Sequence, residues 1–321
     1  MFRRRPIALA PLLLVCALAA SGAAHGADAA RSARLRTDGN LLRTGDHSLH
    51  IEFIDVQDRE RRAELRRWLA ETAEATLTAY GRLPLREATV KIEEIPSRSR
   101  SPVPWGQTER RGGVAVLLYV RQGATLEELR ADWTAVHELS HLFHPYLGQS
   151  GRWLAEGLAS YYQNVLRARS GLLDEAEAWR RLDGGFDRGR QENSGLRLDE
   201  LSRSHRGRMR VYWAGAAYWL EMDLALRRSG SSLDAVLARY SDCCLQGTGE
   251  VAPEAFIAEL DRIAGGDRFA LLYRRHVGAR AFPSLDASYA ALGLGETEAG
   301  TLRLSEDAAA RRLRRAVMGR R

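Results

Sequence analysis

The segment His137-Glu138-Leu139-Ser140-His141 constrains this chain more than any other feature, because it is an HExxH motif. On an α-helix, positions i and i+4 lie on one face about one turn apart, so His137 and His141 can bind the same metal ion. Glu138 is rotated by about 100° from His137 around the helix, where its carboxylate can act on a water molecule instead of the metal. The motif therefore predicts a zinc site with Glu138 as general base.

An HExxH motif can also occur by chance on a surface helix that binds no metal. The residues around this motif are largely apolar, namely Trp133, Val136, Leu139, Leu142 and Phe143. Burying two histidines and a glutamate among them without a metal would leave polar groups poorly paired, which costs free energy. The surroundings therefore favour the metal site.

A catalytic zinc ion needs a third protein ligand and one open position. Position 147 is Leu, whereas a metzincin would have a histidine there, so that class is excluded. His144 lies only three residues after His141, and we expect it to be a rim or structural residue. Glu156 is the one charged residue in the run 153–162. It can be a solvated acid at a helix start, but its apolar neighbours favour a role as the third ligand.

The first residues have the order of a secretory signal peptide. Three arginines at positions 3–5 precede an apolar run at 7–20 and small residues at 21–27. The apolar run is shorter than the roughly 20 residues of a membrane-spanning helix. We therefore expect a signal peptide at 1–26, an exported protein that is periplasmic or secreted, and no integral membrane segment after cleavage. An uncleaved anchor is the alternative.

The charge of the chain gives little support for a polyanionic partner. The signal peptide contains three arginines and no acidic residue, so its removal lowers the formal net charge from +7 to +4. We expect no nucleic-acid partner. The basic tail at 301–321 is expected to be a solvated helix end, with contact to an anionic membrane surface as the alternative.

Only Cys243 and Cys244 remain after the predicted cleavage site. Adjacent cysteines rarely bond to each other because the ring strains the backbone. We therefore expect no disulfide framework, and the chain has no CxxC pair for a zinc ribbon. The oxidation state of the two cysteines is left open.

Apolar periodicity predicts strands early in the chain and helices later. We expect strands at 47–54, 89–95 and 113–120, and a loop at 96–106. Expected helices are at 58–80, 125–145, 153–167, 172–182, 210–229, 231–240, 253–264 and 267–277. This order indicates an α+β fold, with a flexible lead-in at 27–46 and a single catalytic domain at 47–300. A β-containing lobe at about 47–146 and a helical lobe at about 147–300 would form that domain.

The run W-x-x-E-G-x-x-x-Y-Y at 153–162 resembles the glycyl aminopeptidase family of gluzincin (HExxH…E) zinc metallopeptidases. It is more loosely similar to the aminopeptidase N family, and the chain also resembles stand-alone peptidase-MA-like proteins. Further similarities lie at 220–234, at 282–283 and at 292–293, so that the resemblance covers about 105–295. It implies a thermolysin-like zincin core with a small mixed β-sheet lobe, a bound Zn²⁺ and a peptide or protein substrate.

The resemblance extends to Tyr212-Trp213-Ala214-Gly215, which is similar to a Tyr-x-Lys-Gly element with Ala214 in place of the lysine. The tyrosine of that element steadies the transition state, which implies a catalytic role for Tyr212. A core aromatic residue is the alternative for this position. We expect Trp153, Tyr161 and Tyr162 to pack in the core.

The families that the chain resembles have a glycine-rich strand before HExxH that also carries an acidic residue. This chain has the glycines, in the segment Gly112-Gly113-Val114, but no acidic residue in that segment. We expect these three residues to bind substrate, with the strand at 112–120 pairing with an extended peptide by edge addition. The choice between endopeptidase and aminopeptidase stays open.

These features favour an exported zinc metallopeptidase that hydrolyses peptide bonds. The first alternative is a non-catalytic zinc-containing peptide-binding or scaffold protein of the cell envelope, a pseudo-peptidase. Glu138 argues against it, since a structural zinc needs no base and prefers four protein ligands. The second alternative is an envelope-associated binding protein whose HExxH motif is accidental.

Overall fold

The computed structural model describes residues 34–321, apart from 193, 205, 246 and 299. The predicted signal peptide, 1–26, and the first part of the predicted lead-in lie outside the described residues. All described residues belong to the unit Ser32–Arg321. Among them, no helix combines the length and the apolar character that a membrane crossing requires.

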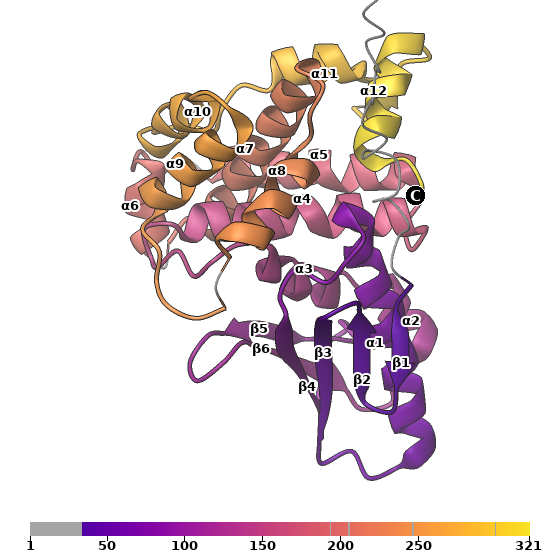
Figure 1. The fold of residues 1–321 in the computed structure, drawn as a ribbon. Coiled ribbons are helices and arrows are strands. Elements are labelled where there is room, and N and C mark those ends of the chain that lie inside the picture. The colour runs from indigo at the N-terminus through magenta and orange to yellow at the C-terminus, as the bar shows by residue number, and fades with distance from the viewer. Residues whose placement is uncertain (1–33, 193, 205, 246, 299) are drawn as a thin grey trace, which may run out of the picture. The chain divides into compact units, whose positions relative to one another are not determined.

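A mixed six-stranded sheet forms the first part of this unit, with the strand order β1-β2-β3-β4-β6-β5 (Figure 1). The neighbours β3, β4 and β6 are parallel, and the other pairs are antiparallel. Alternate side chains of the parallel strands, such as Val90, Val116 and Leu118, are buried in one core with Leu65 and Leu69, as the two-residue period of a strand requires. The elements are β1 (Arg36–Asp38), β2 (Leu41–Thr44), β3 (His47–Ile54), α1 (Arg59–Tyr80), β4 (Glu87–Ile95), β5 (Trp105–Glu109) and β6 (Ala115–Arg121).

The strands expected at 47–54, 89–95 and 113–120 are present as β3, β4 and β6. Two expectations were wrong. The lead-in at 27–46 contains β1 and β2, and the loop at 96–106 ends in β5. Strand β5, Trp-Gly-Gln-Thr-Glu, has no apolar alternation because only Gly106 and Thr108 turn toward α3, and its other side chains are exposed. An edge strand of this kind gives no periodic apolar signal.

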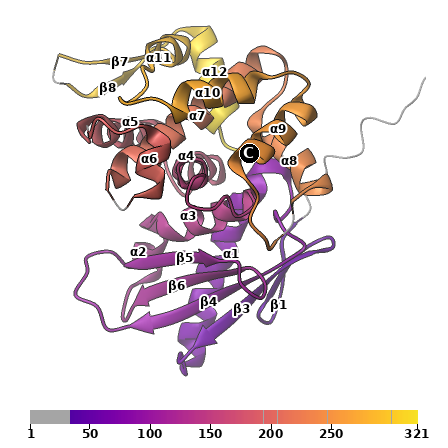
Figure 2. The same ribbon diagram turned by 90° about the vertical axis from the view of Figure 1, so that its left-hand side faces the viewer.

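The helix expected at 125–145 is broken in three. It consists of α2 (Leu126–Ala131), α3 (Thr134–Ser140) and the 3₁₀ turn η1 (His141–Phe143). Asp132 causes the break, because its backbone is extended and its carboxylate accepts a hydrogen bond from the backbone N–H of Thr134 at 2.7 Å. An aspartate in this position ends one helix and caps the next. The HExxH motif therefore lies on its own short helix, between the sheet and the helical part (Figures 1 and 2).

Helices make up most of the remaining chain, with α4 at the centre (Figure 2). Trp153, Tyr161 and Tyr162 of α4 are fully buried, as expected. Two helices, α6 and α11, and the hairpin β7–β8 were not expected. The elements are α4 (Arg152–Ser170), α5 (Glu175–Gln191), α6 (Leu198–Arg203), α7 (Arg208–Arg228), α8 (Leu233–Cys243), α9 (Pro253–Ala264), α10 (Arg268–Val277), α11 (Asp286–Leu292), β7 (Leu294–Glu296), β8 (Leu302–Leu304) and α12 (Ala308–Met318).

Helices α4 and α7 cross so closely that their backbones touch. A Cβ atom on Gly215 would lie 1.9 Å from the carbonyl oxygen of Trp153, and one on Gly157 would lie 2.3 Å from the carbonyl carbon of Gly215. Glycine is the residue that permits such an approach of two backbones. The crossing brings Glu156, next to Gly157, close to Tyr212, one turn before Gly215.

The tail at 301–321 is not the solvated segment that we expected. Its helix α12 buries Ala310, Arg314, Val317 and Met318, which repeat at helical spacing among many charged residues. Beyond the helix, Arg321 pairs with the buried Asp234 at 3.1 Å. The charge density of the tail concealed the apolar stripe that attaches it to the helical part.

The oxidation state of the two cysteines, which the sequence left open, is that of a disulfide, because Cys243 and Cys244 are joined to each other although neighbouring cysteines rarely bond. Cys243 is the last residue of α8, and Cys244 follows it with a non-helical backbone (φ −138°, ψ −19°). This change of backbone direction at the helix end brings the two neighbouring side chains together. The backbone strain that usually keeps adjacent cysteines from bonding is therefore avoided by the non-helical backbone at the end of α8.

Candidate metal centre and its cavity

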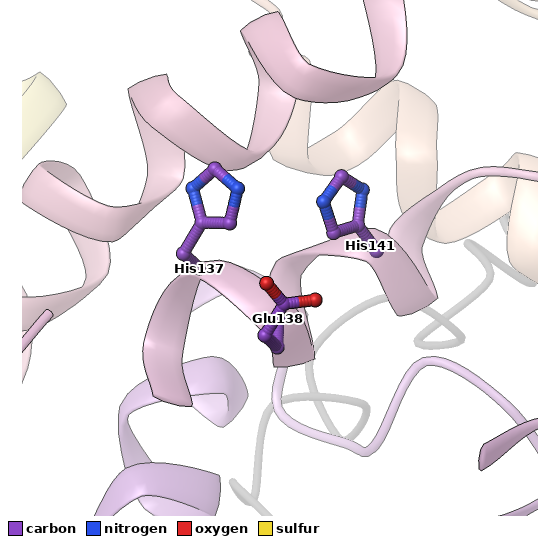
Figure 3. A group of neighbouring side chains, drawn as sticks. All are labelled: His137, Glu138 and His141. Atoms are coloured by element: carbon purple, nitrogen blue, oxygen red, sulfur yellow. The ribbon is translucent and has the colours of Figure 1, made fainter. Parts of the chain in front are cut away.

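The two histidines of the motif stand side by side on α3 and η1, with the carboxylate of Glu138 close to both (Figure 3). The imidazole rings of His137 and His141 are buried, and their centroids lie 5.1 Å apart. His137, Glu138 and His141 each offer a ligand atom within 4.8 Å of the others. The break before Thr134 leaves this local helical geometry intact.

Helix α4 supplies Glu156, whose Oε2 atom approaches both histidines. It lies 3.3 Å from Nε2 of His137 and 3.7 Å from Nε2 of His141. Burial alone raises the pKa of Glu156. A proton on Nε2 of His137, which can donate to this carboxylate when no cation lies between them, and the charge of a protonated His141 outweigh burial and lower the pKa to about 2. The structure therefore brings the three predicted metal ligands together.

A hydrogen bond from α4 fixes the orientation of His137. Its Nδ1 atom lies 2.8 Å from the side-chain oxygen of Gln163, which can only accept. His137 therefore donates from Nδ1, and its Nε2 atom presents a lone pair toward Glu156. Gln163 is seven residues after Glu156, on the same face of α4. This i, i+7 spacing from Glu156 is the signal in the sequence by which Gln163 can be found.

A similar relay orients His141. The Nδ1 atom of His144 lies 2.7 Å from the carbonyl oxygen of Pro145, so it must donate. The Nε2 atom of His144 is then an acceptor, and Nδ1–H of His141 donates a hydrogen bond to it at 3.0 Å. His141 likewise presents the lone pair of its Nε2 atom toward Glu156. His144 thus has a defined contact with the motif rather than a place on the rim.

This donor set fits a metal cation. The lone pairs of His137 and His141 and the carboxylate of Glu156 face one another within 3.3–3.7 Å. Acceptors in such an arrangement repel unless a cation lies between them, and a proton on one ring relieves only one of the contacts. Two histidines and one glutamate are a ligand set found in catalytic zinc sites.

Glu138 is held beside this group by the edge strand β5. Its Oε2 atom accepts a hydrogen bond from Thr108 at 3.2 Å, and burial raises its pKa to about 7. A Cβ atom on Gly106 would lie 2.6 Å from Cγ of Glu138, so the strand can pass the carboxylate only because residue 106 is glycine. Glu138 has the position of a base next to the metal ligands.

Tyr212 of α7 lies against the same group. Its ring is nearly parallel to the ring of His137, with centroids 6.0 Å apart. Its hydroxyl hydrogen-bonds Glu156, and burial and the charge of Glu156 raise the pKa of the phenol, which stays a proton donor. Tyr212 therefore lines the site and is only partly buried, unlike the core tyrosines of α4.

These residues line a cavity of about 1200 Å³. Its walls include the large side chains Trp105, Trp133 and Tyr146, of which 56%, 43% and 42% are exposed. Such exposed aromatic side chains at a cavity indicate ligand contact. Trp133 was expected only as part of the apolar surroundings of the motif, and Trp105 and Tyr146 carry no motif that would mark them in the sequence.

The substrate-binding role expected for Gly112, Gly113 and Val114 is not supported by their position. None of the three lines the cavity; the glycines are exposed, and Val114 is buried. The strand that follows them, β6, is paired on both sides, with β4 and β5, so it has no free edge for a peptide. On this side of the sheet the edge strand is β5, and its residues 105–108 line the cavity.

Comparisons with known proteins agree with this fold. The family model of the M61 glycyl aminopeptidase matches residues 142–219, which include Glu156 and Tyr212 and begin directly after His141. An aminopeptidase N family protein from Idiomarina loihiensis superimposes with a TM-score of 0.57 at 16% identity, covering 81% of this chain and 49% of that one. Yeast LTA4 hydrolase superimposes with a TM-score of 0.50 at 12% identity, covering 77% of this chain and 40% of that one. No curated protein sequence matches significantly.

The family match over residues 142–219 and the shared fold agree with the resemblance to gluzincin metallopeptidases that the sequence predicted. The chain spans about half the length of the aminopeptidase N family protein. The α+β fold, a six-stranded sheet followed by a helical part, is confirmed.

Proposed function

We propose that the protein is an exported zinc metallopeptidase that hydrolyses peptide bonds. The observation that supports this most is the convergence of two histidine lone pairs on Glu156, beside the buried carboxylate of Glu138, at the wall of a large cavity. A non-catalytic zinc scaffold would have no use for Glu138 or for an accessible cavity. Export rests on the signal-like residues 1–26.

The chain supplies the groups that this reaction needs. His137, His141 and Glu156 would hold the zinc ion. The ion would polarise the scissile carbonyl and lower the pKa of a water molecule, so that this water loses a proton readily and can act as the nucleophile. Glu138 accepts a proton from the attacking water and delivers it to the leaving amine. Tyr212 donates a hydrogen bond to the oxyanion that develops on the substrate.

Strand β5 is the edge strand next to Glu138, and this position suits an extended peptide. A peptide that adds to this edge forms backbone hydrogen bonds, so its affinity does not depend on one side chain. The exposed rings of Trp105 and Trp133 would contact apolar side chains of the substrate. Protein or peptide substrates are therefore the chemical class that we propose.

The test combines metal analysis with a peptide-cleavage assay. We expect about one zinc ion per purified chain, lost in the double variant His137→Ala/His141→Ala, because the remaining carboxylate binds too weakly. The variant Glu138→Gln should retain zinc and lose turnover by ~10²–10⁴-fold, since the general base is absent. Zinc retained by the double variant would refute the metal site. Near-normal turnover by Glu138→Gln would remove Glu138 from the mechanism.

A further inference from the structure

The cavity has an unusual charge balance. Among the described residues that line it, seven are arginines and three are glutamates. Two of the glutamates, Glu138 and Glu156, belong to the metal centre. The third, Glu177, accepts hydrogen bonds from both Arg180 and Arg181. The walls away from the metal centre therefore carry an excess of positive charge.

Much of this charge lies on one face of α5. Glu177, Arg181, Gly184 and Arg188 follow one another at intervals of three or four residues and all line the cavity, so they form a stripe along the helix. Helix α5 lies on the helical side, above the sheet (Figure 2). Arg188 rests on the ring of Trp213, the neighbour of Tyr212, at 5.1 Å. Among the described carboxylates, none forms an ion pair with Arg188.

A buried arginine of α4 adds to this stripe. Arg167 lines the same cavity and is 1% exposed. One nitrogen donates to the carbonyl oxygen of Ala131 at 2.8 Å, and the Nε and Nη1 atoms have no partner among the described residues. Burial and the nearby charge of Arg181 lower its pKa to about 10, although the charge of Asp132, which forms no ion pair with Arg167 among the described residues, acts in the opposite direction. A buried guanidinium with unpaired donors beside a second cation is unfavourable unless an anion compensates it.

We propose that Arg167, Arg181 and Arg188 form a subsite for a carboxylate of the substrate, so that tight binding of a peptide depends on that carboxylate. The inference rests on the proposed function, which supplies the peptide. Arginine suits this role because its planar donors match a carboxylate and because it stays charged at neutral pH. An arginine-lined cavity with apolar walls also concentrates anionic ligands near the site. The carboxylate can belong to an Asp or Glu side chain or to the C-terminus of the peptide.

The experiment measures binding without turnover. Zinc-loaded Glu138→Gln protein is titrated calorimetrically with a series of ten-residue peptides that carry one Glu at each position in turn, and with the matched Gln peptides. Each pair is made with a free and with an amidated C-terminus. We expect the best Glu peptide, or the free C-terminus, to bind about tenfold more tightly than its neutral match, and the preference to shrink as salt is raised.

The matched variants locate the effect. In the Glu138→Gln background, Arg181→Gln/Arg188→Gln should abolish the preference, because it removes two exposed charges from the cavity. Arg274→Gln/Arg303→Gln removes the same charge from exposed sites that do not line the cavity, and should keep the preference. Equal dissociation constants for charged and neutral peptides, or an equal preference in both double variants, would overturn the subsite.

Turnover by the wild-type protein separates the two proposals. If it cleaves the Glu and Gln peptides with equal kcat/KM and binding shows no preference, the peptidase function stands and the subsite fails. If the Glu138→Gln protein prefers carboxylates but the wild-type protein cleaves none of the peptides, the subsite stands and the proposed reaction fails. The amidated peptides show which carboxylate is recognised.

Discussion

At the residue scale, the candidate site depends on hydrogen bonds that decide which nitrogen of each histidine carries its proton. Gln163 and His144 each accept a hydrogen bond from an Nδ1–H group, which leaves the Nε2 lone pairs of His137 and His141 free for a metal. Such partners of ligating histidines orient the rings and increase their basicity. We propose that Gln163 and His144 act through the proposed ligands as positioning residues.

We expect Gln163→Ala to weaken zinc binding by ~10–100-fold, because His137 loses the acceptor that fixes its ring. The measurement is a competition titration against a chromogenic chelator. Asn164→Ala is the matched control, since Asn164 is also a buried amide at the cavity but donates to the carbonyl oxygen of Ser160 instead. Equal zinc dissociation constants for the two variants would show that Gln163 has no positioning role.

Tyr212→Phe should lower kcat and leave KM nearly unchanged. A hydroxyl directed at the oxyanion gains strength only as charge develops, so its loss affects the transition state. The loss of one such donor costs about 2.7–4 kcal/mol. Kinetics and the thermal midpoint are measured on the same preparation. An unchanged kcat with a lower midpoint would assign Tyr212 to packing rather than catalysis.

At the element scale, the crossing of α4 and α7 positions Glu156 and Tyr212 with respect to each other. The contact of Gly157 with Gly215 sets the distance between the helix axes, and the two functional residues are close to it in the sequence. The strand β5 has a similar effect on Glu138 through Gly106. The site is thus built at places where only glycine permits the approach of two elements.

Gly215→Ala should therefore destabilise the fold by at least the ~1–3 kcal/mol typical of overpacking, since its methyl group would overlap the backbone oxygen of Trp153. Urea unfolding measures this change. Gly184→Ala in α5 is the control, because its methyl group would meet only the side chain of Arg188 at 3.7 Å. Alanine there should be neutral or stabilise by up to about 1 kcal/mol. A neutral Gly215→Ala would contradict the close crossing.

At the scale of the whole described unit, the buried Asp234 connects distant parts of the chain. It pairs with Arg169 of α4 at 3.0 Å and with Arg321 at 3.1 Å, and it accepts a hydrogen bond from Tyr162. Burial raises its pKa, but the charges of Arg169 and Arg321 outweigh that effect and hold the pKa below its usual value. Its carboxylate therefore links α4, α8 and the C-terminal residues.

This lowered pKa predicts a dependence of stability on pH. The contribution of Asp234 is fully present above its unfolded pKa of about 3.9 and is lost as the pH falls through the lower folded value. Asp234→Asn should cost about 3–5 kcal/mol at pH 7, because the buried arginines lose their counterion. The free energy of unfolding of this variant should also fall less than that of the wild type as the pH is lowered below about 4.

Urea unfolding from pH 7 to pH 2 tests this prediction. Asp242→Asn is the control, because Asp242 is 70% exposed and pairs with Arg82 at the surface, where an ion pair contributes about 0–1 kcal/mol. Identical acid-dependent slopes for the wild type and Asp234→Asn would mean that Asp234 does not stabilise the fold through its charge.

The sequence by itself determined the features that depend on local spacing. The i, i+4 pair His137 and His141, the alternation of β3, β4 and β6, and the apolar face of α4 around Glu156 all follow from helix and strand periods. The α+β order and the gluzincin resemblance followed from these elements. These patterns can be recognised in the sequence because helix and strand periods depend on neighbouring residues in the chain and not on the elements that pack against them.

Only the tertiary structure decided which side chains meet across elements. It paired Gln163 with His137, placed β5 rather than β6 at the edge of the sheet, and gathered the arginines of α4 and α5 around one cavity. It also attached the charged C-terminal segment through Asp234. The physical reason is that these contacts join residues far apart in the chain. Which side chains are buried together, and which charges compensate each other, depends on how the elements pack in the folded protein.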